Sequence, residues 1–163
     1  DKLISNYHKK SLSNSIILYG PKGIGKSTMS FFFIKNIFQK LLDNRDSNDI
    51  NLLYNYSHPN IKYIEKIFDQ KTYKVKSFIT IDQIRNLQNF LNQSPLNNLP
   101  KFVIIDSIND LNLNSANSLL KSLEEPKKNT YFILIAHQLS NILPTIRSRC
   151  VKFYLNSPNI KEF

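Results

Sequence analysis

The segment that most constrains this chain is Gly20–Thr28, which matches the pattern G-x-x-x-x-G-K-[ST]. The short apolar run Ile16–Tyr19 precedes it and predicts a buried strand, and a helical pattern begins at Lys26. A phosphate-binding loop needs this context, because the backbone N–H groups of the loop and the helix N-terminus together face the phosphates. We therefore predict a phosphate-binding loop; the alternative is a tight turn that binds no ligand.

The residue types in this loop suit the binding of a nucleoside triphosphate. Glycine lets the backbone wrap closely around a phosphate, and the three glycines of the chain are Gly20, Gly23 and Gly25. We expect Lys26 to reach the β- and γ-phosphates of ATP and the Ser27 hydroxyl to ligate Mg²⁺. The motif predicts nucleotide binding but not hydrolysis. The predicted nucleotide-binding residues of the loop are Gly20, Pro21, Lys22, Gly23, Ile24, Gly25, Lys26, Ser27 and Thr28.

Strand and helix patterns alternate along the rest of the chain. Further strands are predicted at 61–65, 101–106, 131–136 and 151–155, and helices at 26–42, 81–94, 114–125 and 143–148. A polar connection is expected at 43–60, and a charged loop from the strand at 61–65 through Lys76. Continuous apolar runs are typical of parallel strands covered on both faces. We predict an α/β fold, a mostly parallel β-sheet sandwiched between helices.

Two helices permit more detailed predictions. Thr80, with Gln83 three residues later, forms a capping-box pattern that predicts the start of the helix at 81–94. The helix at 26–42 is expected to turn four apolar side chains inward, namely Phe32, Phe33, Ile37 and Leu41.

The strand at 101–106 ends in a carboxylate that we expect to complete the nucleotide site. Asp106 is predicted to hold Mg²⁺ through its water shell, and the alternative is an ordinary carboxylate at a strand end. Hydrolysing proteins of this class usually carry glutamate at the next position, where this chain has Ser107, whose hydroxyl cannot act as a general base at neutral pH. Asp110 lacks the spacing to replace it. We therefore expect weak or absent hydrolysis.

Three segments resemble the AAA+ clamp-loader family: Ile-Ile-Asp-Ser-Ile-Asn-Asp-Leu at 104–111, Ala-Asn-Ser-Leu-Leu-Lys-Ser-Leu-Glu-Glu-Pro at 116–126, and Leu-Pro-Thr-Ile-Arg-Ser-Arg-Cys at 143–150. The resemblance implies a AAA+ P-loop NTPase core over 1–163, with a truncated start and with a helical lid and a collar domain outside this chain. Ser107 favours a non-motor subunit over the motor subunit. So does the absence of cysteines around Ser57–Asn60, where the motor subunit usually carries a zinc module.

The resemblance also implies roles for two residues outside the loop and its metal ligands. Arg149, in the Ser-Arg-Cys signature, is implied to be an arginine finger that reaches ATP bound by the neighbouring motor subunit, a contact worth ~10³ or more in rate. The alternative is a structural ion pair, for which Arg147 is the better candidate. His137 aligns with the sensor-1 position, where it would contact a phosphate; a packed or exposed strand-end histidine is the alternative. Cys150 is expected to pack in the core.

The resemblance implies a function in DNA replication, within the clamp loader that uses ATP to load the sliding clamp onto primed DNA for bacterial DNA polymerase III. The chain would be a stator that assembles with the motor and delta subunits and donates Arg149, without being an independent ATPase. Contact with the clamp and DNA would run through the assembled complex. The alternatives are an active motor subunit and a P-loop nucleotide kinase. The kinase is disfavoured because Arg45 is the only arginine before Arg85.

The composition and charge of the chain exclude several other classes of protein. The formal net charge is +10, but the lysines are scattered without an arginine-rich stripe, so charge alone does not predict a nucleic-acid surface. One cysteine excludes a disulfide framework or a Cys₄ zinc module, and it fits a reducing compartment, so we expect a cytoplasmic protein without zinc. No apolar run is long enough to span a membrane. ATP and Mg²⁺ are the expected cofactors.

Overall fold

The computed structural model describes residues 2–42, 51–53 and 57–156. Its main sheet has five strands in the order β2-β5-β6-β1-β7, and every neighbouring pair is parallel. The strands are β1 (Ser15–Tyr19), β2 (Ile61–Glu65), β5 (Lys101–Asp106), β6 (Thr130–Ala136) and β7 (Val151–Tyr154).

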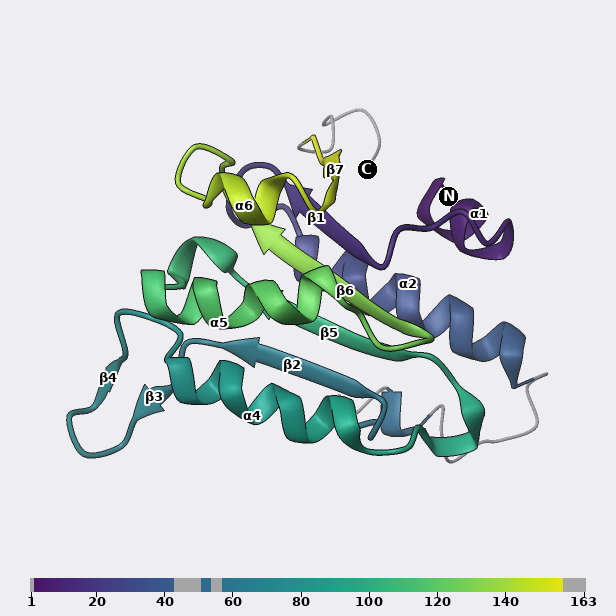
Figure 1. Cartoon of the computed structure of the whole chain (residues 1–163), viewed down its shortest axis with the longest axis horizontal. Helices are drawn as coiled ribbons and strands as arrows, with labels where there is room; N and C mark the ends of the chain where they lie inside the picture. The colour runs from purple at the N-terminus through teal and green to yellow at the C-terminus, as the bar shows by residue number, and fades with distance from the viewer. Residues whose placement is uncertain (1, 43–50, 54–56, 157–163) are drawn as a thin grey trace.

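Helices cover both faces of this sheet (Figure 1). On one face lie α1 (Lys2–His8) and α2 (Lys26–Leu41). On the other face lie α4 (Ile81–Asn92), α5 (Leu113–Glu124) and α6 (Pro144–Arg147). The predicted α/β fold class is therefore confirmed.

Successive side chains of each strand point to opposite faces of the sheet, so two hydrophobic clusters form, one on each face. In β5, Phe102 and Ile104 pack with the side chains of α2, whereas Val103 and Ile105 pack with those of α4 and α5. All four are fully buried, which explains why the strand is apolar without interruption. Asp106 is two residues beyond Ile104, so it lies on the α2 face of the sheet.

Helix α2 follows the predicted span, but its buried stripe differs from the predicted one. Phe33 and Ile37 are buried as expected, whereas the predictions for Phe32 (60% exposed) and Leu41 (49% exposed) are wrong. The buried stripe instead continues one residue on from each correct position, at Ile34 and Phe38. Residues 31–34 are all apolar, so the sequence alone does not show which side of the helix meets the sheet.

Helix α4 begins as its sequence predicts. Thr80 Oγ1 accepts a hydrogen bond from the Gln83 backbone (3.4 Å), and Gln83 Oε1 accepts one from the Thr80 backbone (3.0 Å). This confirms the capping box, which satisfies two backbone donors at the helix N-terminus.

Several short described elements were not predicted. Helix α1 precedes the first strand, and the charged loop contains an antiparallel hairpin of β3 (Phe68–Asp69) and β4 (Lys74–Val75). The hairpin strands are too short to carry an alternating pattern. The predicted connection at 43–60 lies partly outside the described residues, but His58 and Asn60 at its end are buried. None of the helices in the described ranges is both long and apolar enough to cross a membrane.

Candidate functional site

The predicted nucleotide-binding residues meet at the carboxyl edge of the parallel sheet. Strands β5, β6 and β1 are neighbours and run in the same direction, so the segments that follow them meet at one edge. The loop follows β1, Asp106 ends β5, and His137 follows β6. A pocket of about 420 Å³ opens here, and its lining includes seven of the predicted residues: Lys22, Gly23, Gly25, Lys26, Ser27, Asp106 and His137.

Glycine is needed in the loop for two different reasons. Gly25 caps α2 with a left-handed backbone (φ 82°), a conformation that side chains disfavour. At Gly20, a Cβ atom would lie 2.2 Å from the carbonyl oxygen of Leu155, in the segment after β7. Part of the glycine pattern therefore reflects close packing between strands. The other predicted loop residues, Gly20, Pro21, Ile24 and Thr28, are not among those that line the pocket.

Lys26 points back into the loop. Its side chain is 4% exposed, and Nζ donates hydrogen bonds to the carbonyl oxygens of Gly20 (2.8 Å) and Pro21 (2.6 Å). Burial lowers the pKa of Lys26, and the carboxylate of Asp106 partly offsets this effect. A phosphate in the loop would compete with these carbonyls for the ammonium group, with charge-assisted hydrogen bonds in its favour.

A tyrosine that sequence analysis did not identify connects the two predicted Mg²⁺ ligands. The Tyr63 hydroxyl donates a hydrogen bond to Asp106 Oδ2 (2.9 Å) and lies 3.2 Å from Ser27 Oγ. Tyr63 belongs to β2, the edge strand next to β5. No local pattern around Tyr63 marks it as a site residue, because its partners come from two other elements.

The polar residues after Asp106 are bonded to one another. Ser107 is buried and its hydroxyl donates to Asp110 Oδ2 (2.9 Å), while Lys66 Nζ lies 3.0 Å from Asp110 Oδ1. Burial pushes the pKa of Asp110 upward, but the hydrogen bonds from Lys66 and Ser107 outweigh burial and hold the pKa below its ordinary value. Asp110 is thus an ionised carboxylate committed to internal partners.

His137 lines the pocket beside Lys26. Its backbone N–H donates to Asn109 Oδ1 (2.8 Å), and its Nδ1 is buried without a hydrogen-bond partner among the described residues. Burial, together with the charge of Lys26, holds the pKa of His137 below its ordinary value. The imidazole is therefore neutral at pH 7.

Arg149 lies outside this pocket, in the turn between α6 and β7. Its Nη1 donates to the Thr145 carbonyl oxygen (2.7 Å), and its Nη2 pairs with Glu124 Oε1 of α5 (2.5 Å). The structural ion pair that sequence analysis favoured for Arg147 is thus made by Arg149.

His58 and the cysteine occupy buried structural positions. Cys150 is buried in the core as predicted, and burial raises the pKa of its thiol to about 11. His58 Nδ1 accepts a hydrogen bond from the Asn60 backbone (3.1 Å). Within the described ranges, no group of three or more His, Cys, Asp or Glu side chains could hold a metal ion.

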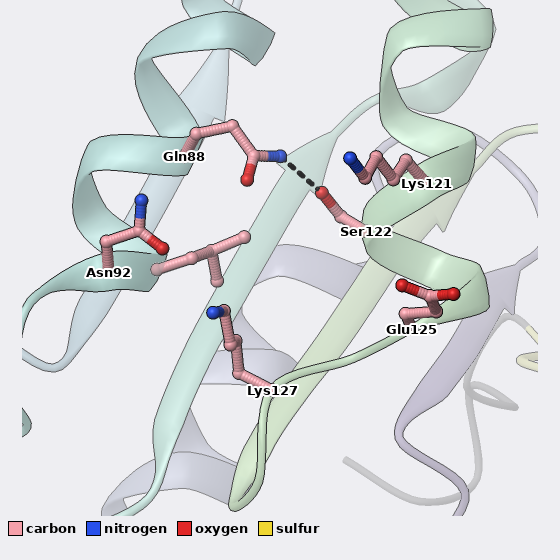
Figure 2. Close-up of a pocket in the computed structure, with 7 residues that line it drawn as sticks. Gln88, Asn92, Lys121, Ser122, Glu125 and Lys127 are labelled. Carbon is pink, nitrogen blue, oxygen red and sulfur yellow. Dashed lines mark hydrogen bonds between the residues drawn. The ribbon is translucent and has the colours of Figure 1, made fainter.

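A second pocket, of about 340 Å³, lies between α4 and α5 (Figure 2). Gln88 donates a hydrogen bond across it to Ser122 Oγ (2.7 Å), and Lys121, Glu125 and Lys127 lie around it. This pocket has charges of both signs and no glycine-rich backbone, and none of the predicted site residues lines it. The edge pocket is therefore the candidate site.

Comparison with known proteins shows which family the chain resembles in sequence. Residues 1–159 match the family model described as "DNA polymerase III, delta subunit". The DNA polymerase III subunit delta' of Pseudomonas aeruginosa is 35% identical over 148 residues, covering 86% of this chain and 42% of the relative. The subunit delta' of Haemophilus influenzae is 35% identical over 108 residues, covering 66% and 31%. The chain thus spans less than half the length of these relatives.

Among solved structures, a DNA polymerase III gamma subunit-related protein of Thermotoga maritima matches with a TM-score of 0.65 and 24% identity. The match covers 97% of this chain and 47% of that chain. At this identity the likeness shows the fold alone.

Proposed function

Because the chain belongs to the family described as DNA polymerase III, delta subunit, we propose that it acts in DNA replication as part of a clamp loader. Its relatives named subunit delta' support a role as the delta' subunit. In this role the protein is a stator that assembles with the motor and delta subunits and donates Arg149 to its neighbour's ATP site. The complex uses ATP to place the sliding clamp on primed DNA.

The position of Arg149 is the observation that carries this proposal. The residue is exposed and does not line the nucleotide pocket of its own chain. An arginine placed in this way acts on ATP only when another subunit brings the nucleotide to it. Glu124 and the Thr145 carbonyl already orient the guanidinium group, so less conformational freedom is lost when it meets a phosphate. Its remaining N–H donors stay available for that contact.

The chain's own site is proposed to turn over little or no ATP. Hydrolysis requires a base or an orienting group close to the attacking water. Ser107 donates its proton to Asp110, and Asp110 is also paired with Lys66. Both side chains line the pocket but are bonded to these partners, which supports a regulatory rather than a motor role.

An active motor subunit is the second candidate, and the complete phosphate-loop motif favours it. The loop has its lysine, its hydroxyl and its glycines in the order that ATP binding requires. Family membership, by contrast, leaves the nucleotide kinase alternative without support. The two clamp-loader roles differ in which residue of this chain limits the rate, Arg149 or Lys26.

The test uses a complex reconstituted from the full-length protein with its motor and delta subunits. Clamp- and DNA-stimulated ATP hydrolysis is measured for the wild type, Arg149→Ala and Lys26→Ala, with Arg147→Ala as the matched control. We expect Arg149→Ala to slow hydrolysis at the neighbouring site by ~10³, while the other two variants stay near wild type. Gel filtration verifies that each complex assembles. A larger loss with Lys26→Ala would identify the chain as a motor.

A further inference from the structure

The hairpin at residues 67–78, which follows β2, exposes apolar side chains that the described part of the chain does not bury. Five large apolar side chains in it are between 44% and 81% exposed, namely Ile67, Phe68, Tyr73, Val75 and Phe78. None of them belongs to the two hydrophobic clusters that pack on the main sheet. The hairpin extends outward, beyond the amino-terminal end of α4 (Figure 1). Large apolar side chains gathered on a surface are typical of an interaction site.

Lysines are interspersed with these apolar side chains. Lys71, Lys74 and Lys76 are exposed, and the one acidic residue of the hairpin is Asp69. Asp69 Oδ1 accepts hydrogen bonds from the backbone N–H groups of Lys71 (2.9 Å) and Thr72 (3.4 Å), so this carboxylate holds the turn. The surface of the hairpin thus combines aromatic rings with an excess of positive charge. A ligand that suits it is negatively charged and has flat apolar faces.

The two faces of the hairpin differ in chemistry. Phe68 pairs in register with Val75, so these two side chains share one face. Lys74 and Lys76 flank Val75 in the sequence, and side chains alternate along a strand, so both lysines belong to the other face. The backbone N–H of Lys76 donates to the Ile67 carbonyl oxygen (2.9 Å), so the pairing continues to this residue. A nucleic-acid strand has a matching division, because its bases offer apolar faces and its backbone carries the phosphates.

A single strand of nucleic acid suits this surface better than a duplex or a protein does. The bases of a duplex are stacked on one another, whereas unpaired bases can stack on aromatic side chains, with basic side chains along the backbone. Protein–protein interfaces, by contrast, are depleted in lysine. Three lysines within the 12 residues 67–78 therefore favour a polyanion as the partner.

We propose that the hairpin binds single-stranded DNA, with Phe68 and Tyr73 stacking on unpaired bases and the three lysines contacting phosphates. The choice of DNA as the strand rests on the proposed function in replication. The contact itself involves neither the phosphate loop nor Arg149, and none of the hairpin residues lines the nucleotide pocket. The chain thus has a second binding surface, separate from its nucleotide pocket.

The test titrates the full-length protein into a fluorescently labelled oligothymidylate, or into a duplex of the same length, and measures anisotropy. Tyr73→Ala removes the most exposed ring of the hairpin, and Phe32→Ala removes an exposed ring of α2 as the matched control. We expect wild type to bind the single strand more tightly than the duplex. Tyr73→Ala should lose about tenfold in affinity for the single strand, which corresponds to ~1.4 kcal/mol, within the range for one stacked base. Phe32→Ala should match wild type.

A second pair of variants tests the charge of the hairpin. Each variant removes three exposed lysines: one combines Lys71→Gln, Lys74→Gln and Lys76→Gln, and its matched control combines Lys40→Gln, Lys127→Gln and Lys128→Gln. On single strands, each phosphate contact contributes about 0.7 to the slope of log affinity against log salt concentration. We therefore expect that slope to fall by about 2 in the hairpin variant and to stay at the wild-type value in the control. A thermal melt of each variant verifies folding.

Three results would overturn the inference. The first is an absence of single-strand binding by wild type at low salt. The second is an equal loss in both lysine variants or tighter binding to the duplex, because either would mean that charge alone drives binding. In the third, the hairpin variants bind the single strand like wild type but fail to assemble with the motor and delta subunits in gel filtration, which would make the hairpin a protein-docking surface. The proposed function is judged separately, by hydrolysis in the complex that carries Arg149→Ala.

Discussion

At the scale of single residues, the candidate functional side chains are held by partners from other elements. Arg149 is oriented by Glu124 of α5, and the two Mg²⁺-ligand candidates are joined through Tyr63. The motifs around Arg149, Ser27 and Asp106 predicted a role for each of them. Glu124 and Tyr63 could not be predicted as their partners, because nothing local to either residue specifies which distant side chain it meets.

Glu124→Gln tests whether Arg149 depends on its partner. The substitution keeps the size of the side chain and removes the charge, so we expect a severalfold loss of stimulated ATP hydrolysis in the assembled complex. The loss should be smaller than for Arg149→Ala, because the Thr145 carbonyl still holds the guanidinium group. Thermal stability should change little, since exposed ion pairs contribute only ~0–1 kcal/mol. Glu125→Gln is the matched control, and hydrolysis equal to wild type in Glu124→Gln would refute the positioning role.

His137 predicts how stability depends on pH. Its pKa is lower in the folded chain than its ordinary value, about 6.5, so the unfolded chain binds the proton more readily. Its contribution to stability is therefore complete above pH 6.5 and is lost as the pH falls through the folded pKa. We expect the melting temperature of His137→Asn to fall less than that of wild type when the pH is lowered from about 7.5 to about 5, a range that spans the unperturbed pKa of histidine. His8→Asn, at an exposed position, should behave like wild type.

At the scale of elements, the phosphate loop depends on the strand and helix that flank it and on the segment after β7. Its pattern predicted the strand before it and the helix after it, and both formed where expected. The close approach of Gly20 to the carbonyl of Leu155 was not predictable, because that contact depends on β7 pairing with β1. Glycine at this position therefore serves the sheet as well as the loop.

Gly20→Ala and Gly23→Ala separate these two demands. Gly23 has a positive φ (84°), but no atom lies within 4 Å of a Cβ built there, so alanine should cost only ~1–2 kcal/mol of strain. At Gly20 the new Cβ meets a backbone oxygen, and we expect a loss of ~3 kcal/mol, at the upper end of overpacking. Urea denaturation measures both. Equal losses would mean that β7 shifts without cost.

At the scale of the whole molecule, stability comes from two clusters on either side of one sheet. The alternation of strands and helices predicted this three-layer arrangement. It did not determine the rotation of α2 about its own axis, which sets whether Phe32 or Phe38 meets the sheet. Phe38 is fully buried, with its ring 5.9 Å from Phe102 of β5, whereas Phe32 faces solvent.

Phe38→Ala and Phe32→Ala test that rotation on the same helix. Removing the buried ring should destabilise the protein by ~3–5 kcal/mol, a large share of the ~5–15 kcal/mol typical of a folded domain. Removing the exposed ring should change stability by less than ~0.5 kcal/mol. Chemical denaturation of the two variants measures the difference. A larger loss of stability for Phe32→Ala than for Phe38→Ala would mean that Phe32 is the buried residue, as the sequence pattern predicted.

The sequence by itself predicted the strands of the main sheet, most of the helices and the chemistry that the phosphate loop can carry. Neighbouring residues alone predicted three features: a phosphate loop between a strand and a helix, an apolar strand ending in Asp106, and the capping box at Thr80. Each of these features depends on interactions between residues that are close in the sequence. Only the tertiary structure decided that Tyr63 bridges Ser27 and Asp106, and that Glu124 orients Arg149. These contacts join separate elements, so they depend on strand order, on register and on the side from which each helix packs, and local residue patterns do not encode these features.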